Sequence, residues 1–173
     1  MFEEILKEVS GANNKVVAYE SKNESNKDIS KQLGVSESST FGKIVNFTAG
    51  ISIENGWLRL FGGEASENIE SIASWNQIGN DNNSVIDEAI MIGYDVKGGF
   101  FAINSGAFNS DLGIINYYAP DTLAWESLDL NYIDFFYCSF WKRNRFFTKA
   151  IFSEKIIVKS FFYSFCRPRG KSF

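Results

Sequence analysis

The sequence predicts an α+β domain in which helices pack on one face of an antiparallel sheet of about six strands. Short segments rich in β-branched and aromatic residues alternate with turn signals along the middle of the chain, which is typical of hairpin-connected strands. An Asn-Gly and a Gly-Gly dipeptide mark two tight turns there. Segments at both ends of this region have the apolar spacing of helices that cover one face of a sheet.

A single domain over residues 1–140 is expected, followed by a basic, aromatic tail over residues 141–173. The chain has 173 residues, 45% of them hydrophobic and 17 of them Phe, so it can bury a core without disulfides or a metal. The net charge of the chain changes from negative to positive near the same boundary. Residues 1–138 contain 8 Lys and Arg against 20 Asp and Glu, whereas residues 139–173 contain 9 against 1. An acidic body with a basic tail calls for an explanation.

Helices and a strand are expected before the hairpin region. Residues 2–9 have apolar positions at helical spacing and acids in the first turn. Residues 25–33 form a second predicted helix, which Gly34 ends. Residues 15–20 have the β-branched content of a strand.

The middle of the chain is expected to form a series of strands. Asn55-Gly56 joins two of them, because both positions of this turn favour positive φ angles. Gly98-Gly99 is expected to form another hairpin bend, and Trp75-Asn76 to cover an edge of the sheet. The predicted strands cover residues 43–48, 51–54, 57–61, 89–93, 97–104, 113–119 and 122–128.

A final helix is expected to begin at Asn131. The Asn131 side chain can accept a hydrogen bond from an early backbone N–H, and an acid follows three residues later, as in a capping box. The apolar face predicted for this helix has i, i+3, i+4 and i+7 spacing and consists of Ile133, Phe136, Tyr137 and Phe140.

The absence of histidine excludes more function classes than any motif suggests. Ser-His-Asp and Cys-His catalysis and His-ligated metals are ruled out together. No glycine-rich phosphate-binding motif is present either. We therefore expect no catalytic residues, no metal site and no cofactor. The alternative is a hydrolase or transferase that works through carboxylates, but the spacing of the acids does not favour one.

A cytoplasmic protein without a transmembrane segment is expected. The sequence has no long uncharged apolar run, and residues 1–4 are acidic where a secretory leader would be basic.

Four segments resemble a bacterial family known as domain of unknown function 2625, and the resemblance covers roughly residues 1–138. This family has no established activity, so the resemblance implies no mechanism. The segments are Ile51–Gly62, Ser74–Asn76, Gly98–Asn104 and Tyr117–Glu126.

The order of these elements is also remotely similar to the SMI1/KNR4-like (SUKH) superfamily. The order is strand, Gly-rich bend, strand, a strand containing Trp125-Glu126, and a helix with Tyr132 and Phe135. Many members of that superfamily are immunity proteins, which bind and neutralise bacterial toxins, often nucleases. This resemblance implies an immunity-like protein with a SUKH-like fold, by analogy of fold alone.

The tail departs from the family at Trp141-Lys142-Arg143. Moving the reading frame one base forward changes Trp141 to Gly and allows acidic residues to follow, as the family leads us to expect. One hypothesis is therefore that residues 141–173 are a frameshifted extension. The alternative is a working basic, aromatic segment that contacts an anionic membrane or nucleic acid.

Our leading functional hypothesis is a non-catalytic binding protein that presents a negatively charged surface to a basic toxin. Such a surface would steer a basic partner onto the domain, would not bind nucleic acid, and would use aromatic anchors for affinity. Arg59 has a second interpretation as half of a partly buried ion pair, and Trp57 and Trp125 have one as core residues. The candidate binding residues are Trp57, Arg59, Asp95, Asp121, Trp125 and Glu126.

Overall fold

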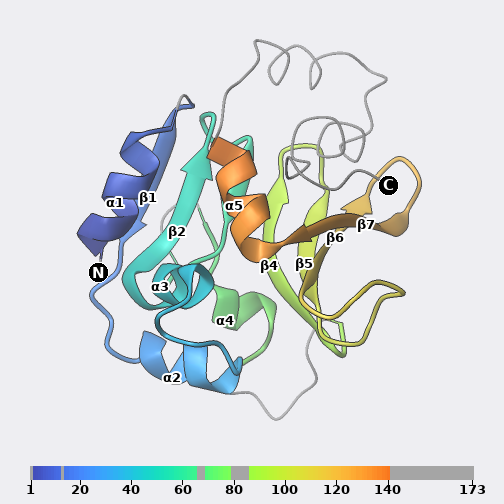
Figure 1. Ribbon diagram of the computed structural model, residues 1–173, viewed down its shortest axis with the longest axis horizontal. Helices are drawn as coiled ribbons and strands as arrows, with labels where there is room; N and C mark the ends of the chain where they lie inside the picture. Colours follow the sequence, from blue (N-terminus) through green and yellow to red (C-terminus); the bar gives the residue numbers. More distant parts are fainter. Residues whose placement is uncertain (1, 13, 66–68, 79–85, 141–173) are drawn as a thin grey trace, which may run out of the picture.

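The computed structural model describes residues 2–12, 14–65, 69–78 and 86–140 (Figure 1). These residues form five helices and one antiparallel sheet of seven strands, in which each strand pairs with its neighbours in sequence. The elements are α1 (Phe2–Ser10), β1 (Val16–Glu20), α2 (Asn26–Gln32), α3 (Thr40–Phe47), β2 (Thr48–Ile53), β3 (Leu58–Leu60), α4 (Ile72–Trp75), β4 (Ala89–Asp95), β5 (Phe100–Asn104), β6 (Ile114–Ala119), β7 (Ala124–Asn131) and α5 (Tyr132–Phe140). The prediction of helices with an antiparallel sheet is confirmed, but the sheet has seven strands rather than about six.

One face of the sheet is covered by α1, α3 and α5 (Figure 1). A row of directly paired residues runs across β2 to β6 on this face, and every residue in it is buried. The Phe101 ring lies 5.0 Å from the Phe135 ring of α5, which identifies the covered side. The row consists of Ile51, Leu60, Gly93, Phe101 and Tyr117.

The short helix α4 lies against the opposite face. Its Trp75 ring is 6.3 Å from Tyr94 and 5.2 Å from Phe100. The expectation that every helix packs on one face was therefore wrong for α4. The chain after β3 is tied to the start of α4 by a bridge between Gly62 and Ser71, and this holds α4 on that side.

Asn76 completes the edge of β4 where β3 ends. The Met91 backbone N–H donates to Asn76 Oδ1 at 2.7 Å, and Asn76 Nδ2 donates to the Met91 carbonyl at 2.9 Å. The side-chain amide thus replaces a strand backbone at this point. The prediction that Trp75-Asn76 covers an edge of the sheet was therefore wrong: β4 is an inner strand, where Asn76 continues the pairing beyond β3, and the Trp75 ring packs on a face.

Three hairpin turns lie at the same end of the sheet because the strands alternate in direction. The turn between β2 and β3 has positive φ angles of 50°, 57° and 88° at Glu54, Asn55 and Gly56, so the predicted Asn-Gly turn is confirmed. The β4–β5 turn contains Gly98 at φ 86°, which confirms the second predicted hairpin. Residues 120–123 form the third turn.

Helix α3 replaces the strand that was predicted over residues 43–48. The Ser39 side chain caps the helix by accepting from the Gly42 backbone N–H at 3.0 Å. Ile44 and Val45 suggested a strand, but in the helix they share a buried face with Phe41. Tertiary packing therefore overrides their β propensity.

Helix α5 begins as predicted but is rotated by one residue. Asn131 Oδ1 accepts from the Asp134 backbone N–H at 2.9 Å, and Asn131 Nδ2 donates to the Asp134 carboxylate at 2.9 Å. Ile133 and Tyr137 are 47% and 40% exposed, so the predicted apolar face was partly wrong. The buried face consists of Tyr132, Phe135, Phe136, Ser139 and Phe140.

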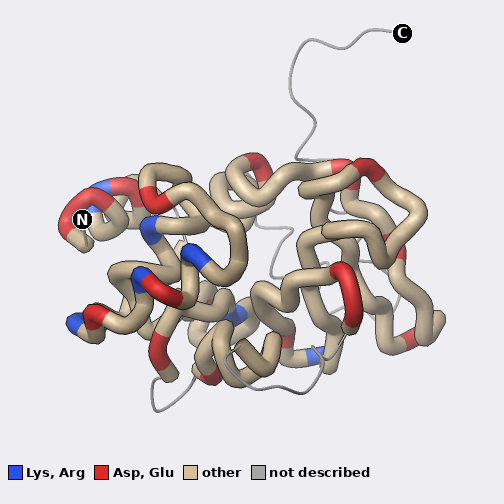
Figure 2. The backbone as a smooth tube through the Cα atoms, turned by 90° about the horizontal axis from the view of Figure 1, so that it is seen from below, with Lys and Arg blue, Asp and Glu red and all other residues tan. Residues whose placement is uncertain are grey.

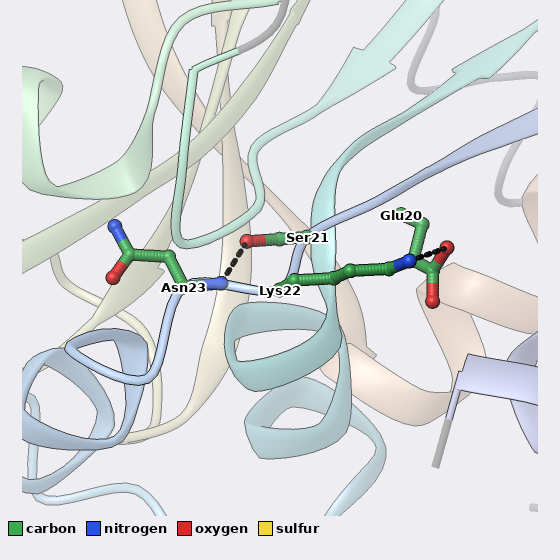
Figure 3. A network of polar contacts seen from close by, with 4 residues as sticks. All are labelled: Glu20, Ser21, Lys22 and Asn23. Atoms are coloured by element: carbon green, nitrogen blue, oxygen red, sulfur yellow. Dashed lines mark hydrogen bonds and ion pairs between the residues drawn. The ribbon is translucent and has the colours of Figure 1, made fainter.

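The link from β1 to α2 is a compact polar turn. The Asn23 backbone N–H donates to Ser21 Oγ at 3.3 Å, and Lys22 Nζ lies 3.8 Å from the Glu20 carboxylate (Figure 3). Ser21 Oγ in turn donates to the Glu64 carboxylate at 2.6 Å. This bond joins the N-terminal part of the fold to the segment that follows β3.

Candidate binding surface

A second row of directly paired side chains crosses the sheet on the face opposite α1, α3 and α5. Tyr94 pairs with Phe100, Phe100 with Tyr118, and Tyr118 with Trp125. All four are half-buried, in contrast to the buried row beneath the helices. We call Tyr94, Phe100, Tyr118 and Trp125 the aromatic row. Arg59 extends it by one strand, because it is the direct partner of Tyr94.

Ring contacts hold the aromatic row in place at both ends. The Trp125 ring lies 5.5 Å from the Tyr118 ring and 4.8 Å from the Phe108 ring. Phe108 belongs to the loop after β5, which Asn104 fixes by accepting from the Gly106 and Phe108 backbone N–H groups at 2.9 and 3.0 Å. The rings are therefore pre-organised rather than free to change rotamer.

Arg59 lies at the β3 end of the row. Its guanidinium carbon is 5.5 Å from the centre of the Tyr94 ring, a cation–π geometry. No carboxylate in the described part of the chain lies within ion-pair distance of this half-buried guanidinium, so the alternative of a structural ion pair gains no support. Gly56 makes room for it, because a Cβ there would lie 2.5 Å from an Arg59 Nη atom.

Asp95 is buried and stabilises the β4–β5 hairpin. Its exposure is 6%, and one carboxylate oxygen accepts from the backbone N–H groups of Lys97 and Gly99 at 2.8 and 2.9 Å. The other oxygen accepts from the Tyr117 hydroxyl at 2.8 Å. Burial, and then the negative charge of Asp95, raises the pKa of Tyr117. Asp95 therefore lies outside any exposed binding surface.

The other sequence-predicted residues separate by face. Trp57 is half-buried in the β2–β3 turn, and Asp121 is exposed in the β6–β7 turn at the same end of the sheet. Trp125 belongs to the aromatic row, so it is neither fully core nor fully exposed. Glu126 is the direct partner of Tyr117 and points to the helix-covered side. Tyr94, Phe100 and Tyr118 were not predicted as binding residues, because only the strand register places them beside Arg59 and Trp125.

Charge separates along the domain. Residues 1–60 carry 7 Lys and Arg against 8 Asp and Glu, whereas residues 61–140 carry 1 Lys against 12 Asp and Glu. Figure 2 shows the basic positions gathered in the half near the N-terminus, while the other half carries mainly acidic ones. Among the described residues, three ion pairs join members of the first part, namely Glu4–Lys43, Glu20–Lys22 and Asp28–Lys31. The half that holds the aromatic row is therefore strongly acidic.

The carboxylates do not converge into a metal site in the part of the chain that the structure describes. No group of three or more Cys, Asp and Glu side chains there could hold a metal ion. Among the same residues, no helix is long and apolar enough to cross a bilayer. The sequence-based expectations of no catalytic residue and no cofactor stay predictions.

Comparison with known proteins places this fold in a family. The model of the family described as protein of unknown function DUF2625 matches residues 1–155. The chain belongs to this DUF2625 family. The match reaches past the expected limit at residue 138 and into the basic tail, which lies outside the described residues. The frameshift and working-segment hypotheses for that tail therefore both stay predictions.

Two bacterial relatives are similar to part of this chain. The putative uncharacterised protein YbfG of Escherichia coli (strain K12) is 37% identical over 114 residues, which are 64% of this chain and 51% of the relative. An uncharacterised protein of Haemophilus influenzae is 32% identical over 99 residues, which are 57% of this chain and 43% of the relative. The chain thus spans about half the length of the curated relatives it matches.

Proposed function

We propose that this DUF2625 chain is a non-catalytic binding protein whose acidic half docks onto a basic protein partner. The observation that supports this most is the segregation of charge, with 1 Lys against 12 Asp and Glu in residues 61–140. A surface of one sign attracts a partner of the opposite sign over long distances and raises the rate of encounter. Affinity then comes from short-range contacts, for which half-buried aromatic rings are well suited.

The class of partner that fits best is a basic toxin, which makes the protein immunity-like. This step rests on the remote resemblance to the SUKH superfamily together with the acidic surface. An acidic cover over the basic face of a nuclease would occupy the surface that otherwise meets nucleic acid. A cytoplasmic location belongs to the same proposal.

The test begins with capture of partners by the immobilised full chain from its native host. A captured protein is then produced in pure form, and its association rate and affinity are measured by surface plasmon resonance at two salt concentrations. We expect a basic protein whose association slows by roughly tenfold as salt rises through the physiological range.

A pair of matched charge reversals shows whether the acidic half is responsible. Asp121→Lys changes an exposed acid of residues 61–140, and Glu37→Lys makes the same change in residues 1–60. We expect the first to slow association and the second to leave it unchanged. An acidic partner, or equal effects of both variants, would contradict the proposal. Substrate turnover that is lost when one carboxylate is neutralised would support the carboxylate-dependent hydrolase or transferase instead.

A further inference from the structure

We infer that the docking surface is the aromatic row together with Arg59, and that the basic partner lays an apolar segment along the row while placing one of its carboxylates on Arg59. This inference rests on the proposed function and deepens it, because it names the surface and the chemistry of the segment that binds there.

The first argument is the unsatisfied chemistry of Arg59. A half-buried guanidinium offers five N–H donors in a planar fork, and its usual partner is a carboxylate bound by two parallel hydrogen bonds. The described residues contain many acids, yet none of them forms an ion pair with Arg59, whose guanidinium lies beside Gly56 and 5.5 Å from the centre of the Tyr94 ring. The stacking fixes the plane of the guanidinium and leaves its fork to receive a carboxylate from outside.

The second argument is the position of the rings. The aromatic row continues directly from Arg59 through four paired strands, so one extended segment of a partner can contact both. Its rings are held by Trp75 at one end and Phe108 at the other, and they stay half-buried. Fixed rings of this kind lose little conformational entropy when a partner covers them.

The third argument is the charge around the row. Exposed acids belong to the segments that flank the strands of the row, one before β4, one in the loop after β5 and one in the β6–β7 turn, namely Glu88, Asp111 and Asp121. The Ser105 and Ala107 backbone N–H groups donate to the Glu88 carbonyl at 2.9 and 3.1 Å, which joins Glu88 to the loop that carries Phe108. Lys97 is the one basic residue of residues 61–140. The surroundings therefore favour a cationic partner, and Arg59 is the local exception that fixes its orientation.

The probes are short synthetic peptides that vary independently in three features: several Lys residues, one Trp or Tyr, and one Glu. Binding to the full chain is measured by fluorescence anisotropy. We expect the tightest binding from peptides that combine all three features. Trp125→Ala should lower the affinity for these peptides by roughly tenfold or more. Arg59→Gln should remove the preference for Glu, whereas Arg59→Lys should keep part of it because Lys retains the charge but not the planar fork.

Two controls separate surface effects from folding. Ile133→Ala removes an apolar side chain that is 47% exposed on α5, away from the row, and should leave binding unchanged. Circular dichroism checks that each variant is folded. If Trp125→Ala unfolds the chain, Tyr118→Ala serves instead, because it removes another half-buried ring of the aromatic row and should also weaken binding of the peptides that carry Trp or Tyr.

Each outcome bears on one proposal or both. Suppose that the Ile133→Ala variant binds the cationic peptides more weakly, while the variants of the aromatic row and of Arg59 bind them normally. This result would overturn the proposed docking surface but leave the proposed binding function standing. Equal binding of peptides with and without Glu would overturn the role of Arg59. If no cationic peptide binds at all, the proposed function falls together with this inference.

Discussion

Phe100 and Phe101 are neighbours on β5, yet they lie on opposite faces of the sheet and in different surroundings. Phe101 is 2% exposed and contacts Tyr117 and Phe135 with ring distances of 4.9 and 5.0 Å. Phe100 is half-buried, and its ring lies 5.2 Å from Trp75 and 6.5 Å from Tyr118. The comparison teaches that the same side chain stabilises the fold on one face and remains available for contact on the other.

The largest expected effect comes from truncating these two residues in turn. Phe101→Ala should lower the free energy of unfolding by about 3–5 kcal/mol, because it leaves a cavity under α5. Phe100→Ala should lower it by about 1–2 kcal/mol, because part of that ring already meets solvent. Urea denaturation of both variants measures the difference. Equal losses would show that the two faces contribute alike to the core.

The next effect concerns the buried carboxylate on the covered face. Asp95→Ala should cost about 2–3 kcal/mol, because it leaves the Lys97 and Gly99 N–H groups and the Tyr117 hydroxyl without their acceptor. Asp121→Ala is the matched control in an exposed turn and should change stability by less than about 0.5 kcal/mol. Thermal unfolding followed by circular dichroism compares them. A stable Asp95→Ala variant would argue against a structural role for this carboxylate.

Removing single hydroxyl groups gives a smaller effect. Tyr117→Phe should cost about 1 kcal/mol, because it breaks the hydrogen bond to Asp95. Tyr118→Phe, one residue further on the open face, should be nearly neutral. Burial raises the pKa of Tyr117 in the folded protein, so the wild type loses stability as pH rises above about 10, the usual pKa of Tyr. The difference in the free energy of unfolding between the wild type and Tyr117→Phe should therefore become smaller above that pH.

The smallest effect is expected outside both faces, at the surface ion pair between Glu4 and Lys43, which are 2.9 Å apart. The hydrogen bond from Lys43 lowers the pKa of Glu4. The pair therefore contributes above the usual pKa of Glu, and the contribution is lost as pH falls through the lowered value. Glu4→Gln should shift the melting temperature slightly at neutral pH and not at all in acid. A large shift in melting temperature would mean that this surface ion pair contributes more to stability than the side chains on the face opposite α1, α3 and α5.

Local signals in the sequence were sufficient for much of the fold. Asn55-Gly56 and Gly98-Gly99 predicted hairpins because their backbone angles depend on those residues alone, and Asn131 predicted the start of α5 through its own cap. Helix α3 was not predicted, because Ile44 and Val45 have a local preference for strands. The Ser39 cap and the burial of both side chains in the core outweigh this preference.

The candidate binding surface was harder to predict, because it depends on pairing between strands. Arg59 and Trp125 were among the candidate binding residues predicted from the sequence. The strand register that aligns them through Tyr94, Phe100 and Tyr118 is a long-range property, which the sequence pattern does not contain. Asp95 looked like a surface acid at the end of a strand. Only the fold shows that Tyr117 and the hairpin N–H groups enclose it.

The sequential strand order has a consequence for how such a domain grows. Because each strand is added beside the previous one, the described sheet ends in two outermost strands, β1 and β7, and neither is locked between others. New strands can join such an end without rethreading the existing chain. At β7, however, Asp129 adopts φ 55° and the pairing with β6 shifts, and the pairing of β1 with β2 shifts between Ala18 and Glu20, so both borders are irregular. Irregular pairing therefore limits lateral extension of the domain at both borders.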